Sequence, residues 1–203
     1  MPPGSFRAYL FDCDGTIADS MPLHYVAWSQ ALGEWNCAFD EELFYAWGGK
    51  PPTEIIARLN QMQSLNMPVE AVDRQREALY FKLIPQLQPV AEVMEHIKAQ
   101  DGRIPYALVS GSRRESVIAS LTALGILNKF AVIVCEGDYL HSKPHPQPFL
   151  VAASRLGVPP EQCLVFEDSE LGIQAATAAG MASVKVERPP RSMSSCNPVH
   201  DGS

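Results

Sequence analysis

Short apolar runs that alternate with helical segments constrain the fold of this chain more than any other feature. One run, residues 6–11, lies near the N-terminus, and four more follow Pro89. The later strands are expected at residues 105–109, 130–135, 163–166 and 183–186. Because a helical segment separates each strand from the next, the pattern predicts an α/β fold with a parallel sheet and helices on both faces.

Helical periodicity fills the intervals between these strands. After Pro89, helices are predicted at residues 91–99, 115–124, 146–156 and 171–179. The last three are followed by Gly125, Gly157 and Gly180. Glycine just past a helix is a typical stop signal because it accepts the left-handed backbone conformation, so these positions support the predicted helix ends.

The segment between the first strand and Pro89 is predicted to be wholly helical. Its helices are expected at residues 24–32, 41–47, 53–65 and 69–87. The expected domains are an α/β core of residues 1–18 and 88–188, a small helical domain of residues 19–87 and a flexible tail of residues 189–203. Trp28, Trp35 and Trp47 are expected in the core of the helical domain, and Arg76 and Lys82 on its solvated face.

Charge and cysteine usage limit the partners and the compartment. The net charge is −7 and the pI is near 5.2, which argues against nucleic acid or an anionic membrane as the main partner. No apolar run approaches the ~18 residues of a membrane span. The five cysteines are scattered and form no C-x-x-C pair, which is typical of a reducing compartment. The cytoplasm is therefore the expected location.

The motif Asp12-Cys13-Asp14-Gly15-Thr16 directly follows the first strand. Side chains at positions i and i+2 share a face of a strand, so the carboxylates of Asp12 and Asp14 are expected to repel each other. A folded protein tolerates this arrangement best if a cation lies between them, or if one group is a nucleophile and the other an acid. The same residue types also form ordinary turns, so the motif alone leaves both interpretations open.

Polar residues follow the later strands at the same edge of the predicted sheet, where ligands of open α/β sheets bind. Three acids, Asp12, Asp14 and Asp168, supply the oxygen ligands that Mg²⁺ prefers. A carboxylate can also act as a nucleophile and form an aspartyl-phosphate. Glu167-Asp168-Ser169 alone would equally suit a helix N-cap, but its place at a strand end favours a magnesium site.

Two further strand ends supply groups suited to a phosphate. Ser110, with the backbone N–H groups of Gly111 and Ser112 at a helix start, can bind phosphate oxygens. Lys143 supplies a point charge for the same phosphoryl group. Taken singly, the first is a common turn and the second a common solvated loop, but their order at successive strand ends favours phosphoryl transfer.

These elements resemble the signature of the haloacid dehalogenase superfamily of phosphohydrolases. The resemblance covers residues 6–187 and rests on D-C-D-G-T, on Ser110, on K-P-H-P from Lys143, and on E-D-S-E-L-G-I-Q-A-A-T-A-A-G from Glu167. It implies a Rossmann-like core with a small α-helical cap, as in the β-phosphoglucomutase-like branch. The helical segment after the first motif would be that cap.

The resemblance also implies roles for individual residues. Asp12 would be the nucleophile and Asp14 the general acid and base. Mg²⁺ would be held by Asp12, the backbone carbonyl of Asp14 and Asp168, with Glu167 nearby. The phosphoryl group would be bound by Ser110, Gly111 and Lys143. His24 would belong to the cap hinge and first cap helix, where its counterpart in the mutase gates the second aspartate of the motif.

Two activities of this branch remain open on the sequence. A mutase must hold a second phosphate with an arginine in the cap loop, whereas the loop here is Gly48-Gly49-Lys50-Pro51-Pro52. Lys50 offers a point charge but not a bidentate fork. The loop resembles the bacterial fructose-1-phosphate phosphatase type more closely, although the pair Arg113-Arg114 could bind an anion.

We therefore expect a magnesium-dependent phosphatase of small phosphorylated sugars that works as a monomer, with β-phosphoglucomutase as the alternative. A fold retained only for binding is the third hypothesis.

Overall fold

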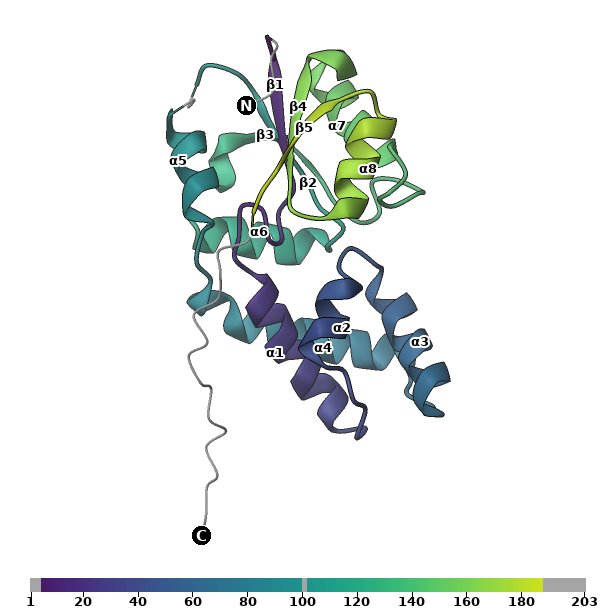
Figure 1. Ribbon diagram of the computed structural model, residues 1–203. Helices are drawn as coiled ribbons and strands as arrows, with labels where there is room; N and C mark the ends of the chain where they lie inside the picture. Colours follow the sequence, from purple (N-terminus) through teal and green to yellow (C-terminus); the bar gives the residue numbers. More distant parts are fainter. Residues whose placement is uncertain (1–4, 100–101, 188–203) are drawn as a thin grey trace.

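A five-stranded parallel sheet forms the centre of the molecule (Figure 1), and its strand order is β3-β2-β1-β4-β5. The computed structural model describes residues 5–99 and 102–187. The predicted tail, residues 189–203, lies outside the described residues. The strands are β1 (Ala8–Phe11), β2 (Tyr106–Val109), β3 (Phe130–Val134), β4 (Cys163–Glu167) and β5 (Ala182–Lys185). All neighbouring strands pair in parallel, which confirms the predicted sheet.

Helices cover both faces of this sheet, as predicted. They are α5 (Ala91–Ala99), α6 (Arg114–Ala123), α7 (Gln147–Leu156) and α8 (Glu170–Ala178), with short 3₁₀ turns at Leu127–Lys129 and Pro160–Gln162. Alternate residues of β1 face opposite sides: Tyr9 and Phe11 pack with α5 and α6, whereas Ala8 and Leu10 pack with α7 and α8. The fully buried strand of four apolar residues is what a doubly covered parallel sheet requires.

The helical segment between β1 and α5 has an apolar core of its own. It contains α1 (Met21–Gly33), α2 (Glu41–Ala46), α3 (Pro52–Gln63), α4 (Val69–Leu83) and a 3₁₀ turn at Ile84–Gln86, and no strand lies within residues 21–87. Its core includes Trp28 and Trp47. The prediction for Trp35 was wrong, since this side chain is 37% exposed just beyond the end of α1.

The prediction of a solvated Arg76 was also wrong, whereas Lys82 is exposed as expected. Arg76 is buried because its guanidinium group lies over the ring of Trp28 on the neighbouring helix and pairs with Asp73.

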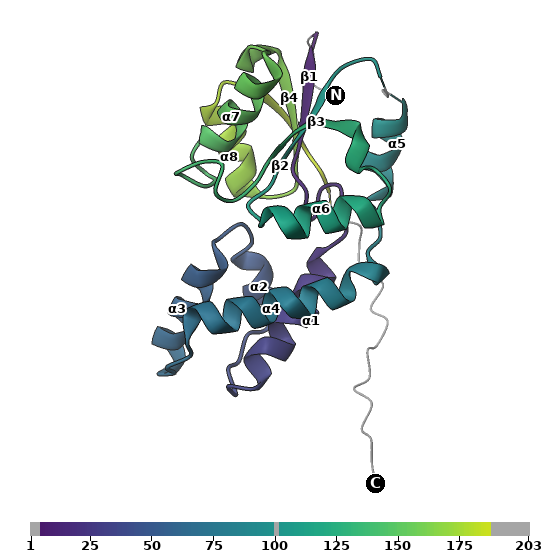
Figure 2. The ribbon, with the colours of Figure 1, turned by 180° about the vertical axis from the view of Figure 1, so that it is seen from behind.

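Two linkers join the helical segment to the sheet, and they lie side by side. The backbone N–H of Asp19 donates to Gln88 over 2.9 Å, and that of Val90 donates to Ile17 over 2.8 Å. Helix α6 lies between the sheet and α4 in both ribbon views (Figures 1 and 2), and Tyr80 of α4 lies 3.0 Å from the Ser120 hydroxyl of α6. The chain thus passes between the sheet and the helical segment near residues 18 and 88. These positions fit the predicted domain boundaries, which stay predictions. Among the described residues, no helix is long and apolar enough to cross a membrane.

Candidate active site

A cavity of about 400 Å³ lies between the carboxyl ends of the strands and the helical segment. The residues predicted to act in catalysis or to bind metal, phosphate or substrate all line it: Asp12, Asp14, His24, Lys50, Ser110, Gly111, Lys143, Glu167 and Asp168. Of the pair predicted to bind an anion, Arg113 lines the cavity, whereas Arg114 does not and pairs with Asp138. They come from chain segments far apart in sequence, which meet because the carboxyl ends of parallel strands share one edge of a sheet. The structure therefore brings the predicted residues together, while their roles remain predictions.

Lys143 lies between two carboxylates at the base of the cavity. Its Nζ is 2.6 Å from Oδ1 of Asp12 and 2.7 Å from Oε2 of Glu167, and it also donates to the carbonyl of Val109 over 3.2 Å. Burial alone would lower the pKa of Lys143, but the charges of Asp12 and Glu167 outweigh it and raise that pKa well above its usual value. Lys143 is therefore a fixed positive charge next to Asp12.

Three carboxylates at this position could hold a metal ion. One oxygen from each of Asp12, Glu167 and Asp168 lies within 4.8 Å of the others. Burial and the charges of Glu167 and Asp168 raise the pKa of Asp12 well above its usual value, against the opposing effect of Lys143. This excess of negative charge, presented by hard oxygen donors, fits Mg²⁺.

Gly15 allows Asp168 to approach this cluster. Its backbone has a φ of 89°, and a Cβ at this position would lie only 2.5 Å from Oδ2 of Asp168. The DxDGT turn thus needs glycine for two reasons, backbone conformation and space.

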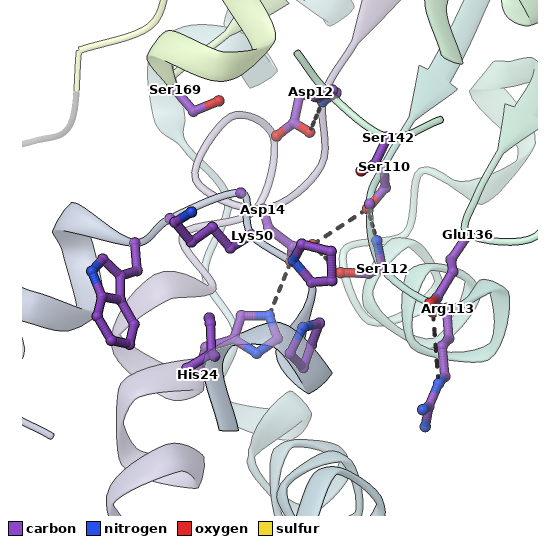
Figure 3. A pocket seen from close by; sticks show the side chains of 18 of the residues that line it. Asp12, Asp14, His24, Lys50, Ser110, Ser112, Arg113, Glu136, Ser142 and Ser169 are labelled. Carbon is purple, nitrogen blue, oxygen red and sulfur yellow. Dashed lines mark hydrogen bonds and ion pairs between the residues drawn. The ribbon is translucent and has the colours of Figure 1, made fainter. Parts of the chain in front are cut away.

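Asp14 turns away from the cluster of Asp12, Glu167 and Asp168 and toward the helical segment. Its carboxylate accepts hydrogen bonds from the hydroxyls of Ser20 and Ser112, both 2.7 Å away, and lies 3.2 Å from Nε2 of His24. Burial raises the pKa of Asp14, but these contacts outweigh it and hold that pKa well below its usual range. Figure 3 shows His24 and Ser112 directed toward Asp14 from different sides.

The predicted repulsion between Asp12 and Asp14 was therefore assigned to the wrong pair. The crowded carboxylates are those of Asp12, Glu167 and Asp168. Asp14 has its own partners, of which the Ser20 and Ser112 side chains were missed by the sequence analysis. No motif marks these two serines, and only the folded turn shows that their hydroxyls reach the carboxylate.

The loop after β2 supplies the groups predicted to bind phosphate. Ser110 is buried, and its Oγ accepts the N–H of Ser112 over 3.0 Å. Gly111 is exposed, and nothing lies within 4 Å of where its Cβ would be. An open backbone next to a buried hydroxyl and the Lys143 ammonium is an arrangement that suits an anion.

The helical segment forms the opposite side of the cavity. His24 stacks on Tyr80 with the ring centroids 3.8 Å apart. Lys50 pairs with Glu54 at 3.1 Å on a half-exposed surface. A Cβ on Gly49, in the same loop, would lie 3.3 Å from Cδ1 of Leu171 in α8. The cap loop therefore touches the core beside the Glu167 and Asp168 segment.

Gly172 leaves the space that the Glu167 side chain occupies. A Cβ at residue 172 would lie 2.0 Å from Cδ of Glu167, whose Oε1 also accepts hydrogen bonds from the N–H and hydroxyl of Ser169. Gly172→Ala must therefore displace Glu167 from Lys143. We expect at least a roughly tenfold loss of kcat/KM with a stability loss of about 1–3 kcal/mol. Gly33→Ala, at an exposed helix end with open space, is the matched control and should keep full activity.

Several known proteins that resemble this chain are named as phosphatases or as β-phosphoglucomutase. The family model described as haloacid dehalogenase-like hydrolase matches residues 9–186. Fructose-1-phosphate phosphatase YqaB of Escherichia coli strain K12 is 36% identical over 182 residues, which are 89% of this chain and 96% of that protein. The phosphorylated carbohydrates phosphatase of Thermotoga maritima is 28% identical over 182 residues, which are 88% of this chain and 83% of that protein.

A solved structure extends the similarity to the fold. The crystal structure of β-phosphoglucomutase from Clostridium difficile has a TM-score of 0.78 and 28% identity to this chain, and the match covers 90% of this chain and 85% of that one. The similarity thus spans both the sheet and the inserted helices.

Proposed function

Because the chain belongs to the haloacid dehalogenase-like hydrolase family, we propose that it is a magnesium-dependent phosphatase of small sugar phosphates similar to fructose 1-phosphate. The observation that carries the proposal is the contact of Lys143 with both Asp12 and Glu167, beside Asp168, at the base of the cavity. A fixed ammonium group next to a carboxylate and a cluster of hard oxygen donors is what phosphoryl transfer to a carboxylate needs.

In this proposal Asp12 and Asp14 divide the reaction between them. The Asp12 carboxylate attacks phosphorus, a new P–O bond forms, and the P–O bond to the sugar breaks while a protonated Asp14 gives its proton to the leaving oxygen. Because the contacts with Ser20, Ser112 and His24 favour the charged form of Asp14, this step requires them to loosen when the substrate binds, so that Asp14 first takes up the proton that it then donates. Water then attacks phosphorus and loses a proton to Asp14. The bond to Asp12 breaks and inorganic phosphate leaves. Ser20, His24 and Ser112 position the Asp14 side chain at the junction of core and cap.

The remaining residues bind and balance charge. Asp12, the Asp14 carbonyl and Asp168 would hold Mg²⁺, with Glu167 nearby; when bound, the ion would stabilise negative charge on the phosphoryl oxygens. Lys143, the Ser110 hydroxyl and the Gly111 N–H would bind the same oxygens. We expect the helical segment to close over the bound substrate and to exclude water from the site.

A phosphatase is favoured over a mutase for a reason of side-chain chemistry. Where a mutase would carry a bidentate arginine, three residues after a cap-loop glycine, this chain has Pro51 or Pro52, and the neighbouring Lys50 offers only a point charge. The Escherichia coli relative is named for fructose 1-phosphate. The similarity to β-phosphoglucomutase keeps that activity as the second candidate.

One chain supplies both the cap and the core of the cavity, so a monomer is proposed to suffice. The buried free thiols of Cys13, Cys37, Cys135 and Cys163 suit the cytoplasm.

Phosphate release from a panel of sugar phosphates tests this proposal. With Mg²⁺, the protein is expected to release phosphate from fructose 1-phosphate and related monophosphates; a chelator should abolish the release and added Mg²⁺ should restore it. Full activity after exhaustive chelation would contradict the metal requirement. A coupled dehydrogenase assay that detects glucose 6-phosphate from β-glucose 1-phosphate, with little free phosphate, would favour the mutase. No release from any compound would favour the binding hypothesis.

A further inference from the structure

Paired charges line one wall of the cavity between α4 and the core. Asp73, Arg76 and Glu77 lie on α4, whereas Arg113 and Glu136 belong to the core loops after β2 and β3. Figure 3 shows Arg113 directed toward Glu136, on the side of the pocket opposite Lys50. None of these five residues is used in the proposed chemistry.

Asp73 is the centre of this group. Its carboxylate is buried and accepts hydrogen bonds from Nε and Nη2 of Arg76, over 3.1 and 2.8 Å, and from Nη2 of Arg113. One buried carboxylate thus occupies donors of two guanidinium groups, one from the cap and one from the core. Such charge-assisted pairs are the strongest hydrogen bonds of side chains.

Two more carboxylates occupy the same arginines. Nη2 of Arg76 lies 2.7 Å from Oε2 of Glu77, and Nε of Arg113 lies 3.7 Å from Oε2 of Glu136. Three carboxylates therefore face two guanidinium groups, and this wall carries net negative charge. Carboxylates and guanidinium groups can still exchange hydrogen bonds with uncharged hydroxyls.

We propose that Asp73 determines specificity by neutralising Arg76 and Arg113, so that the enzyme selects sugar monophosphates and rejects sugar bisphosphates. The inference rests on the proposed phosphatase function. A second phosphate carries a charge of about −1.5 to −2 near neutral pH, and at this wall it meets net negative charge instead of free arginines. The hydroxyl groups of a monophosphate meet no such barrier.

The rate of phosphate release from fructose 1-phosphate and fructose 1,6-bisphosphate measures this selection. The unaltered protein is expected to prefer the monophosphate. Asp73→Asn keeps the shape but removes the negative charge that both arginines share, so that two carboxylates instead of three face them. It should raise the ratio of bisphosphate to monophosphate kcat/KM about tenfold. Adding Arg113→Gln to Asp73→Asn should reverse most of that gain. Glu95→Gln, which removes the same charge from the exposed face of α5, should leave the ratio unchanged.

Because Asp73 is buried, Asp73→Asn can lower the stability of the fold, and a second variant controls for that effect. Glu136→Gln changes a half-exposed side chain and should shift the ratio in the same direction, by a smaller factor. An unchanged ratio in both variants, with activity on the monophosphate retained, would overturn the proposal, as would an unaltered protein that hydrolyses both compounds equally well. Failure of the proposed function looks different: no phosphate is released from either compound, and calorimetric titration with each compound then still measures the discrimination.

Discussion

Asp12→Asn is expected to lower phosphate release from fructose 1-phosphate by at least about a thousand-fold. The amide keeps the size of the carboxylate but cannot attack phosphorus. It also removes one oxygen from the cluster with Glu167 and Asp168, so binding of Mg²⁺ should weaken as well. Initial rates with excess Mg²⁺ separate the two effects, because added metal restores only the binding loss.

The fold should survive this substitution. Asp12 is buried among carboxylates that raise its pKa, so removing its charge relieves repulsion while Lys143 keeps its contact with Glu167. The thermal unfolding temperature is expected to stay the same or rise. Asp40→Asn is the matched control, since Asp40 is an exposed N-cap of α2 and Asn caps a helix equally well. Activity of Asp12→Asn within tenfold of that control would contradict the assignment of the nucleophile.

Lys143→Met is expected to remove activity and stability together. The substitution leaves Asp12 and Glu167 buried without their shared cation, which should cost about 3–5 kcal/mol in the free energy of unfolding near neutral pH. Phosphate release should fall at least about a hundred-fold, because a fixed charge next to the phosphoryl group is lost. Lys185→Met removes a lysine from an exposed ion pair with Glu170 and should cost less than about 1 kcal/mol.

The stability loss of Lys143→Met should also depend on pH. Lys143 opposes the rise in the pKa of Asp12, so without it the folded-state pKa rises further above the unfolded-state value. A group of this kind favours the folded state below its unfolded pKa, and that contribution disappears as the pH rises. The deficit relative to the unaltered protein should therefore be smaller near about pH 5 than near about pH 7. Denaturant unfolding at both values measures it; a deficit that grows toward acid would contradict the account.

The grouping of Asp12, Lys143 and Asp168 in one cavity could be predicted from the sequence because sheet geometry determines it. Asp12, Lys143 and Asp168 follow three different strands, and the carboxyl ends of parallel strands meet at one edge whatever the loops do. The order of the strands in the sheet was therefore not needed to predict that these residues lie together. The same argument gives no direction for a side chain within the turn, which is why Asp14 was expected to face Asp12 and instead lies against Ser20 and Ser112.

The helices of the cap could be predicted from the sequence, but which side of each helix is buried could not. Helical periodicity predicted α4, yet Arg76 was placed in solvent because a charged side chain usually lies there. Its burial depends on Trp28 of α1 and on Asp73, and Asp73 in turn depends on Arg113 of the core. Such contacts depend on how the cap packs against α6, and local sequence patterns do not predict that packing. The charged wall of the cavity was missed for the same reason.

Chemical trapping of the intermediate shows directly whether the phosphoryl group is transferred to Asp12. The protein is mixed with Mg²⁺ and fructose 1-phosphate carrying a radiolabelled phosphoryl group, quenched in acid within the first turnover, and treated with borohydride, which reduces an aspartyl-phosphate to homoserine. We expect protein-bound label in the samples quenched within the first turnover, and homoserine at position 12 in the digested peptide after reduction. Turnover without any protein-bound label, or label on a residue other than Asp12, would contradict it.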